Sequence, residues 1–277
     1  MLKISQHFKY FFLNHCQNYP HFTAKKMQTR KADDIQRKSK LAFPMISATY
    51  AKKYYGVVDS KDIVKKYRAE DILDKVTSKI VYNRRDCNDE CLGLYFKPEK
   101  TTKVWLDKIK SEKIGNCFES SIVTFAALIA NGYYNSDMAK VNIDVQFVDN
   151  DSGKVIYSDM LPLDHSIVVS DMKKGYSPKS EKKFILDSWN NFTGEISEAN
   201  GLYRATADES KIKFAIDVVR NNMESAYSGL KTVNLDNCHP RVGFYITEDG
   251  MNFDPEALIE ASKYLQEKYP ELRLKND

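Results

Sequence analysis

The chain has 277 residues, of which 42% are hydrophobic and 29% charged, and its formal net charge is only +4. This composition is ordinary for a globular protein with a substantial core, and it excludes a chain that is basic throughout, as many nucleic-acid-binding proteins are. The mean hydropathy of −0.52, with no apolar run near the roughly 18 residues of a spanning helix, argues against a transmembrane protein. Five cysteines is an odd number, which does not fit a disulfide scaffold and leaves at least one thiol free.

The charge is distributed unevenly along the chain. Residues 1–56 carry eleven Lys or Arg and two Asp, a net charge of +9, whereas residues 57–277 carry a net charge of −5. The basic stretch 23–40 shows little apolar periodicity, which predicts an exposed and partly disordered arm. Such an arm either stays solvated or contacts an acidic partner or a membrane surface. We expect no nucleic-acid partner.

The N-terminus does not resemble a Sec signal peptide. Its longest clean apolar run, residues 10–13, is shorter than the roughly 7–15 residues of a signal's apolar region, and no small-residue cleavage site follows. We therefore expect a protein that remains in the cytoplasm of its producer or leaves it through a specialised secretion system.

The helices are predicted from apolar spacing, first over 60–83 and 102–110, with a polar loop over 83–90 between them. The clearest helix spans 117–131 and is apolar on most sides, so it should be buried. It has its own start and stop signals: Asn116 as N-cap, Glu119 three residues later as in a capping box, and Gly132 at the C-terminus.

After this helix the apolar period changes to two, which is typical of strands. The predicted elements that follow are strands at 141–149, 154–160, 165–169, 183–187 and 242–247, a helix within 208–230, and a last helix opened by Asp254 and Pro255. This grouping predicts an α+β fold. We divide it into the basic arm 1–56, a helical lobe 57–114 and an α+β core 115–277.

Cys117 differs from the other cysteines because it would be the first residue of the buried helix. A thiol there faces unpaired backbone N–H groups and the positive end of the helix dipole. Both stabilise a thiolate, which is the nucleophilic form of cysteine. A lone cysteine under a helix cap is more often a small buried residue, so its partners decide the interpretation.

Two such partners occur downstream. His165 begins one predicted strand and Asp187 ends the next, and adjacent antiparallel strands can bring two such residues together. A thiol, an imidazole that deprotonates it and a carboxylate that orients the imidazole are the three groups of nucleophilic acyl transfer. This chemistry needs no metal and no cofactor.

The segments G-N-C-F-E (115–119), D-H-S-I-V-V (164–169) and F-I-L-D-S-W (184–189) resemble the transglutaminase-like branch of the papain-like cysteine enzymes, and most closely its bacterial effector and toxin members. The resemblance implies a papain-like core, with Cys117 as nucleophile, His165 as general base and acid, and Asp187 as the residue that orients His165. It implies peptide-bond hydrolysis, glutamine deamidation or transglutamination of a protein or peptide, such as a host protein.

The resemblance covers about 110–190 and leaves alternatives open. No Gln precedes Cys117 at the spacing of a papain-type oxyanion hole, and Ser188 stands where the family often has Pro. Arylamine N-acetyltransferases share the Cys-His-Asp order, but this chain lacks their Arg-Gly-Gly before the cysteine. A non-catalytic protein that uses the same fold and docks a partner through its basic arm is the other alternative.

Three residues near the predicted triad have supporting interpretations. Asn116 and Glu119 serve as helix caps, and a catalytic role for Glu119 is the less favoured reading. Trp189 either shields the His165–Asp187 pair from water or belongs to the core. Cys87 and Cys91 have a spacing that zinc ligands use, but a second ligand pair is missing unless Cys238 and His239 supply it, so we expect no metal.

Overall fold

A computed structural model describes residues 21–45, 63–91, 98–178, 180–206, 209–228, 234–248 and 254–274. Within these residues the chain forms an α+β fold with seven α-helices and one five-stranded antiparallel sheet. The sheet order is β4-β3-β2-β1-β5. The strands are β1 (Ser136–Asp149), β2 (Val155–Ser170), β3 (Phe184–Asp187), β4 (Phe192–Glu195) and β5 (Cys238–Glu248).

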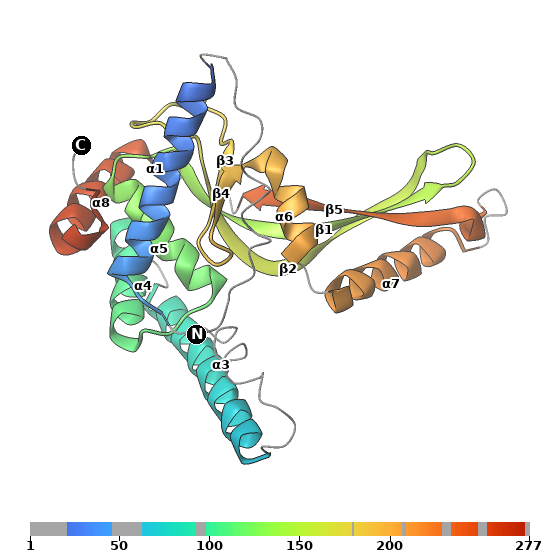
Figure 1. The fold of residues 1–277 in the computed structure, drawn as a ribbon, viewed down its shortest axis with the longest axis horizontal. Coiled ribbons are helices and arrows are strands. Elements are labelled where there is room, and N and C mark those ends of the chain that lie inside the picture. Colours follow the sequence, from blue (N-terminus) through green and yellow to red (C-terminus); the bar gives the residue numbers. More distant parts are fainter. Residues whose placement is uncertain are drawn as a thin grey trace, which may run out of the picture.

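Helices cover both faces of the sheet (Figure 1). On one face α5 (Cys117–Ala130) packs against the sheet, and α1 (His21–Ala42), α4 (Pro98–Glu112) and α8 (Pro255–Lys268) pack around α5. On the other face lie α6 (Ala199–Thr206) and α7 (Glu209–Ala226). The remaining helix, α3 (Ile63–Cys91), packs on α4, on the same side as α5. Because strand side chains alternate, Val168 belongs to the first core and Ile167 to the second.

The three longest strands extend away from the helical end of the molecule, and α7 lies along them (Figure 1). Residues of β1 at every second position face α7 and are almost fully buried: Val141, Ile143, Val145 and Phe147. The alternation predicted from the sequence over 141–149 is therefore confirmed, and β1 begins five residues earlier, at Ser136. β3 and β4 are much shorter, so the sheet is wide only near α5.

Helix α5 forms as its sequence predicts. It begins at Cys117 and ends at Ala130, and every residue from Ser121 onward is buried. Gly132 follows with φ of +83°, a left-handed conformation that costs glycine little. The helix is held against β1, β2 and β3, which places its N-terminus beside the sheet.

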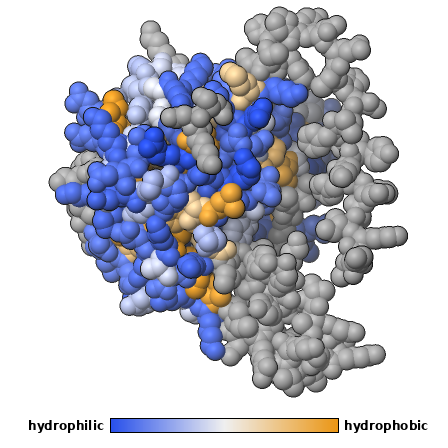
Figure 2. Space-filling model, turned by 60° about the vertical axis from the view of Figure 1, so that its left-hand side comes forward, coloured by the Kyte–Doolittle hydropathy of each residue, from blue (hydrophilic) through white to orange (hydrophobic). Residues whose placement is uncertain are grey.

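The stretch 23–40, expected to be a partly disordered arm, is instead part of helix α1. The helix buries a stripe at the i, i+3, i+4 and i+7 positions: Ala32, Ile35, Gln36 and Ser39. Two of these four residues are polar, which concealed the stripe in the sequence. Figure 2 shows the side of the molecule on which α1 and α8 lie, where hydrophilic side chains dominate. The remainder of the predicted arm, 1–20 and 46–56, lies outside the described residues.

Several other boundaries differ from the predictions. The two strands expected over 154–160 and 165–169 are a single strand, β2, with a register shift opposite Val141 and Asn142. The predicted loop 83–90 is helical, because α3 continues to Cys91. Strand β4 and helix α6 were not predicted. The start of α8 is confirmed, since the Asp254 side chain accepts a hydrogen bond from the N–H of Glu256.

Among the described residues, no helix is long and apolar enough to cross a membrane.

Candidate active site

Cys117 is the first residue of α5 and the only half-buried cysteine in the described part of the chain. Cys87, Cys91 and Cys238 are free and buried. Burial raises the pKa of each of these three thiols, to about 12 for Cys87. They are therefore neutral thiols in apolar surroundings, whereas Cys117 hydrogen-bonds a histidine, His165.

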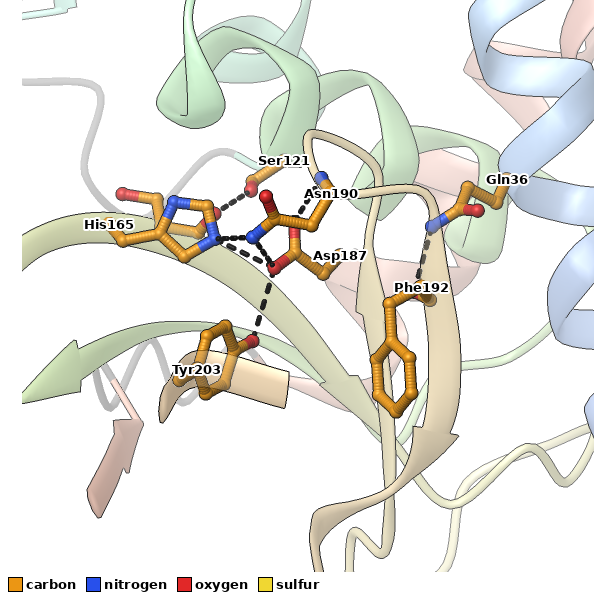
Figure 3. Close-up of polar contacts among 8 residues, drawn as sticks. Gln36, Ser121, His165, Asp187, Asn190, Phe192 and Tyr203 are labelled. Carbon is orange, nitrogen blue, oxygen red and sulfur yellow. Dashed lines mark hydrogen bonds and ion pairs between the residues drawn. The ribbon is translucent and has the colours of Figure 1, made fainter. Parts of the chain in front are cut away.

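His165 and Asp187 form a close pair. The Nε2 atom of His165 lies 2.7 Å from the Oδ2 atom of Asp187, whose side chain has no exposed surface (Figure 3). Because the carboxylate only accepts, Nε2 carries the proton and donates it. The hydrogen bond with Cys117 is then left to the other ring nitrogen, Nδ1. The structure thus brings together the three residues that the sequence predicted as a triad.

The pKa values of this pair move in opposite directions. Burial alone would favour the neutral imidazole, but hydrogen bonds with Asp187 and Cys117 and their negative charges outweigh it and raise the pKa of His165 to about 9. Burial alone would also favour the neutral Asp187, but the hydrogen bond and charge of His165 outweigh it and hold the pKa of that carboxyl below its usual value. At neutral pH the pair is therefore an imidazolium and a carboxylate.

Two further residues complete the surroundings of Asp187. The backbone N–H of Asn190 donates to Oδ1 at 3.0 Å, and its side-chain amide donates to Oδ2 at 2.9 Å. The hydroxyl of Tyr203 on α6 donates to the same Oδ2 at 3.2 Å, and its ring packs edge-on against His165 with centroids 5.8 Å apart. A buried carboxylate with this many donors stays ionised and fixed in position.

Polar side chains on one face of α5 connect the helix to the strands of His165 and Asp187. Ser121, one turn after Cys117, donates to the backbone carbonyl of Ser166 at 2.9 Å. Thr124, almost one turn further, shares a hydrogen bond of 2.6 Å with the hydroxyl of Ser188. Each sheet partner adjoins a triad residue in sequence. These two hydrogen bonds therefore fix the position of the helix relative to the imidazole and the carboxylate.

The lengths of the strands explain why His165 is free to meet the helix. β3 pairs with β2 only over Val168–Ser170 and ends at Asp187. His165 therefore lies beyond that pairing, in a part of β2 that is paired only with β1. A turn follows Asp187 and leads into β4, with Asn190 on it. The imidazole lies beside this turn, between α5 and α6.

Helix α1 supports the same turn. The side-chain amide of Gln36 donates to the carbonyl of Phe192 at 2.9 Å, and Lys40 donates to the Oδ1 atom of Asn191 at 2.6 Å. Asn191 has φ of +61°, a conformation uncommon outside glycine, so its backbone needs such support. The segment predicted as a peripheral arm is thus part of the framework around Asp187.

Glu119 is confirmed as a capping residue and has a second partner. Its Oε2 atom accepts from the N–H of Asn116 at 2.8 Å. The guanidinium of Arg84 also donates to both carboxylate oxygens, at 2.7 and 3.0 Å. Glu119 therefore ties α3 to the start of α5, beside Cys117. Trp189 lies half-buried in the turn after β3, outside the buried core, and its predicted shielding of the pair stays a prediction.

Asn190 and Tyr203 were missed from the sequence. Asn190 follows Asp187 by three residues, and an aspartate that ends a strand often accepts from the backbone of the turn after it, so a local signal existed. Tyr203 had none, because it reaches the site from α6, a separate helix on the other face of the sheet.

The four cysteines in the described part of the chain do not gather into a metal site. Cys87 and Cys91 belong to the core around α5, whereas Cys238 belongs to the core on the opposite face of the sheet. This separation rules out a site built from both sets. Across the described ranges, no group of three or more His, Cys, Asp or Glu residues is placed to hold a metal ion.

No protein-family model, no curated protein and no solved structure matches the chain. The interpretation of the site therefore depends on its geometry.

Proposed function

We propose that the protein is a thiol-dependent acyl-transfer enzyme that attacks amide bonds of a protein or peptide. The single observation that carries the proposal is the contact chain from Cys117 through His165 to the fully buried Asp187. An isolated buried histidine would lose its proton. Here the imidazolium is stabilised on both sides, which is what a thiolate nucleophile beside it requires.

The chemistry follows from the two nitrogens of His165. The Cys117 sulfur attacks the amide carbonyl, the C–N bond breaks, and the imidazolium gives its Nδ1 proton to the departing nitrogen, so that ammonia or an amine leaves a thioester. Water then hydrolyses the thioester, as in a protease or deamidase, or a second amine captures it, as in a transglutaminase. Asp187 keeps the imidazole in the Nε2–H tautomer throughout, with Asn190 and Tyr203 holding Asp187.

The fold supports the resemblance in outline. A cysteine at the start of a buried helix, followed in the chain by antiparallel strands that carry the histidine and the aspartate, is the arrangement expected of a papain-like or transglutaminase-like core. We propose that residues 115–277 form such a core, and that the substrate is a protein, such as a host protein met by a bacterial effector.

The activated thiol is tested by alkylation of Cys117 with iodoacetamide as a function of pH. We expect wild type to react rapidly at a pH where His165→Ala reacts slowly, because the imidazolium that stabilises the thiolate is gone. Cys238→Ala is the matched control, since this buried thiol lies on the other face of the sheet. Equal labelling curves for wild type and His165→Ala would contradict the proposal.

The reaction itself is tested by intact-mass spectrometry of candidate protein substrates. A gain of about one dalton indicates deamidation, fragments indicate proteolysis and a summed mass indicates cross-linking, since these are separate fates of one acyl-enzyme. Each change should disappear with Cys117→Ala. A biological effect that survives in Cys117→Ala would instead support the non-catalytic alternative.

A further inference from the structure

A polar cavity lies at the end of the sheet where β1 begins and β5 ends. It has a volume of about 500 Å³ and is lined by the start of β1, the loop before β3, the end of β5 and α8. None of the residues that line it belongs to the triad or contacts Asp187. The lining residues used below are Tyr134, Asp137, Tyr176, Ser180, Lys182 and Glu248.

Asp137 is the most unusual residue of this cavity. It is 98% buried, and its Oδ1 atom has no hydrogen-bond partner among the described residues. The hydroxyl of Ser180, buried in the same cavity, also lacks a partner there. A buried carboxylate oxygen without a partner is destabilising, so such atoms usually meet a ligand or an ordered water.

The charges around Asp137 are not balanced. Its Oδ2 atom lies 3.5 Å from the ammonium of Lys182, but Lys182 is closer to Glu248, at 2.6 Å. Within the described residues both carboxylates pair with the same ammonium, that of Lys182, so the two of them carry one more negative charge than it neutralises. Burial and the nearby charge of Glu248 raise the pKa of Asp137, and the charge of Lys182 together with hydrogen bonds from Lys182 and the Met138 backbone offsets this only in part.

The shape of the acceptors distinguishes the kinds of cation. One carboxylate oxygen of Asp137 already faces Lys182, so the other oxygen and the Ser180 hydroxyl are single acceptor atoms and not a carboxylate edge. Both atoms are closed off from solvent in this conformation, so a cation that binds them must displace neighbouring side chains. A compact ammonium suits single acceptors, whereas a guanidinium prefers two parallel ones. The rings of Tyr134 and Tyr176 line the same cavity and favour a cation with an apolar stem.

We propose that this cavity binds an alkylammonium group, from a lysine side chain or a free amine, with Asp137 as its carboxylate partner. The site is independent of the triad, so its test does not depend on the proposed acyl-transfer activity.

The proposal is tested by isothermal titration calorimetry of the full chain with Nα-acetyl-lysine methylamide. Nα-acetyl-norleucine methylamide, which lacks the ammonium, is the matched probe and should bind about tenfold more weakly or not detectably. n-Butylammonium distinguishes the two sources of the ligand. If n-butylammonium binds as tightly as the lysine probe, the ligand of the cavity is a free amine. If n-butylammonium binds more weakly, the ligand is a lysine side chain of a peptide.

The variants assign the binding to Asp137. Asp137→Asn should weaken the lysine probe about tenfold or more, whereas Glu181→Gln, an exposed lining carboxylate paired with Lys183, should change it little. Tyr176→Ala, at an exposed position, is the second variant if Asp137→Asn does not fold, and should weaken binding about threefold. Equal binding of the two methylamide probes, wild-type affinity in Asp137→Asn, or no binding of any ammonium probe would overturn the proposal and leave a water-filled cavity.

Discussion

The hydroxyl of Ser121 donates a hydrogen bond of 2.9 Å to the backbone carbonyl of Ser166. Ser121 lies one turn after Cys117 on α5, and Ser166 follows His165 on β2. The bond therefore ties the helix that carries the thiol to the strand that carries the imidazole. It lies one helical turn from Cys117 and one residue from His165.

Removal of this bond should slow the alkylation of Cys117 markedly while lowering the free energy of unfolding only moderately. Ser121→Ala removes this hydrogen bond, and because Ser166 is only partly buried we expect a loss of about 0.5–1.5 kcal/mol in the free energy of unfolding. Because α5 is then less firmly held beside β2, the alkylation rate of Cys117 near neutral pH should fall several-fold. Urea denaturation and iodoacetamide labelling measure the two effects.

The control for Ser121→Ala is Ser262→Ala. Ser262 is equally buried, on α8, and its hydroxyl accepts a hydrogen bond from Gln266, far from the triad. We expect a measurable loss of stability and an unchanged labelling rate. If both variants slow labelling equally, the effect comes from general destabilisation and the Ser121–Ser166 bond has no special role.

Substitution of Asp187 by Asn should lower the pKa of His165. In wild type the value is about 9, raised from 6.5, so His165 contributes stability that is complete below pH 6.5 and is lost as the pH rises through 9. Without the carboxylate, burial dominates and favours the neutral ring. The titration of His165 by NMR should therefore move down by more than one pH unit, and the stabilisation at low pH should shrink.

Asp171→Asn is the control for the aspartate variant. Asp171 is also buried and accepts a hydrogen bond from Asn135 at 2.8 Å, but it does not contact His165. The His165 midpoint should stay near its wild-type value in this variant. A midpoint that does not move in Asp187→Asn would mean that the carboxylate does not control the imidazole.

Helix α1 should contribute to stability as a core helix does. Ile35 is fully buried, and Ile35→Ala should cost about 2–5 kcal/mol in the free energy of unfolding. Met27, on the same helix, is 55% exposed, and Met27→Ala should change stability by no more than about 0.5 kcal/mol. Two small and equal effects would restore the idea of a solvated arm.

Glu119 should stabilise the fold through both of its partners, the N–H of Asn116 and the guanidinium of Arg84. Glu119→Ala removes the cap of α5 and leaves Arg84 without its carboxylate, so we expect a loss of about 1–3 kcal/mol. Glu119→Gln keeps one acceptor for the N–H of Asn116 and should cost less. Thermal denaturation monitored by circular dichroism gives the comparison.

The matched control for Glu119 is Glu112→Ala. Glu112 pairs with Lys79 at 3.2 Å, with both side chains partly exposed, and such a pair contributes about 0–1 kcal/mol. If the two alanine variants prove equally stable, the ion pair between α3 and the start of α5 is a surface feature with no structural weight.

Local signals located most elements that carry the site. Asn116, Glu119 and Gly132 mark the two ends of α5 correctly, because caps and a left-handed terminus are decided by residues next to each other in the chain. The alternating strand β1 and the start of α8 were predictable for the same reason. Boundaries failed where the signal is weak, as at 83–90, where a polar helix resembles a loop.

The sequence by itself therefore determined the α+β class, the position of Cys117 at a helix start, and the candidate partners His165 and Asp187. Only the tertiary structure decided that these three residues meet, that Asn190 and Tyr203 surround the carboxylate, and that α1 packs into the core. These last features depend on contacts between segments far apart in the chain. A buried stripe with two polar residues, or a tyrosine from a distant helix, has a recognisable role only when its partner surface is present.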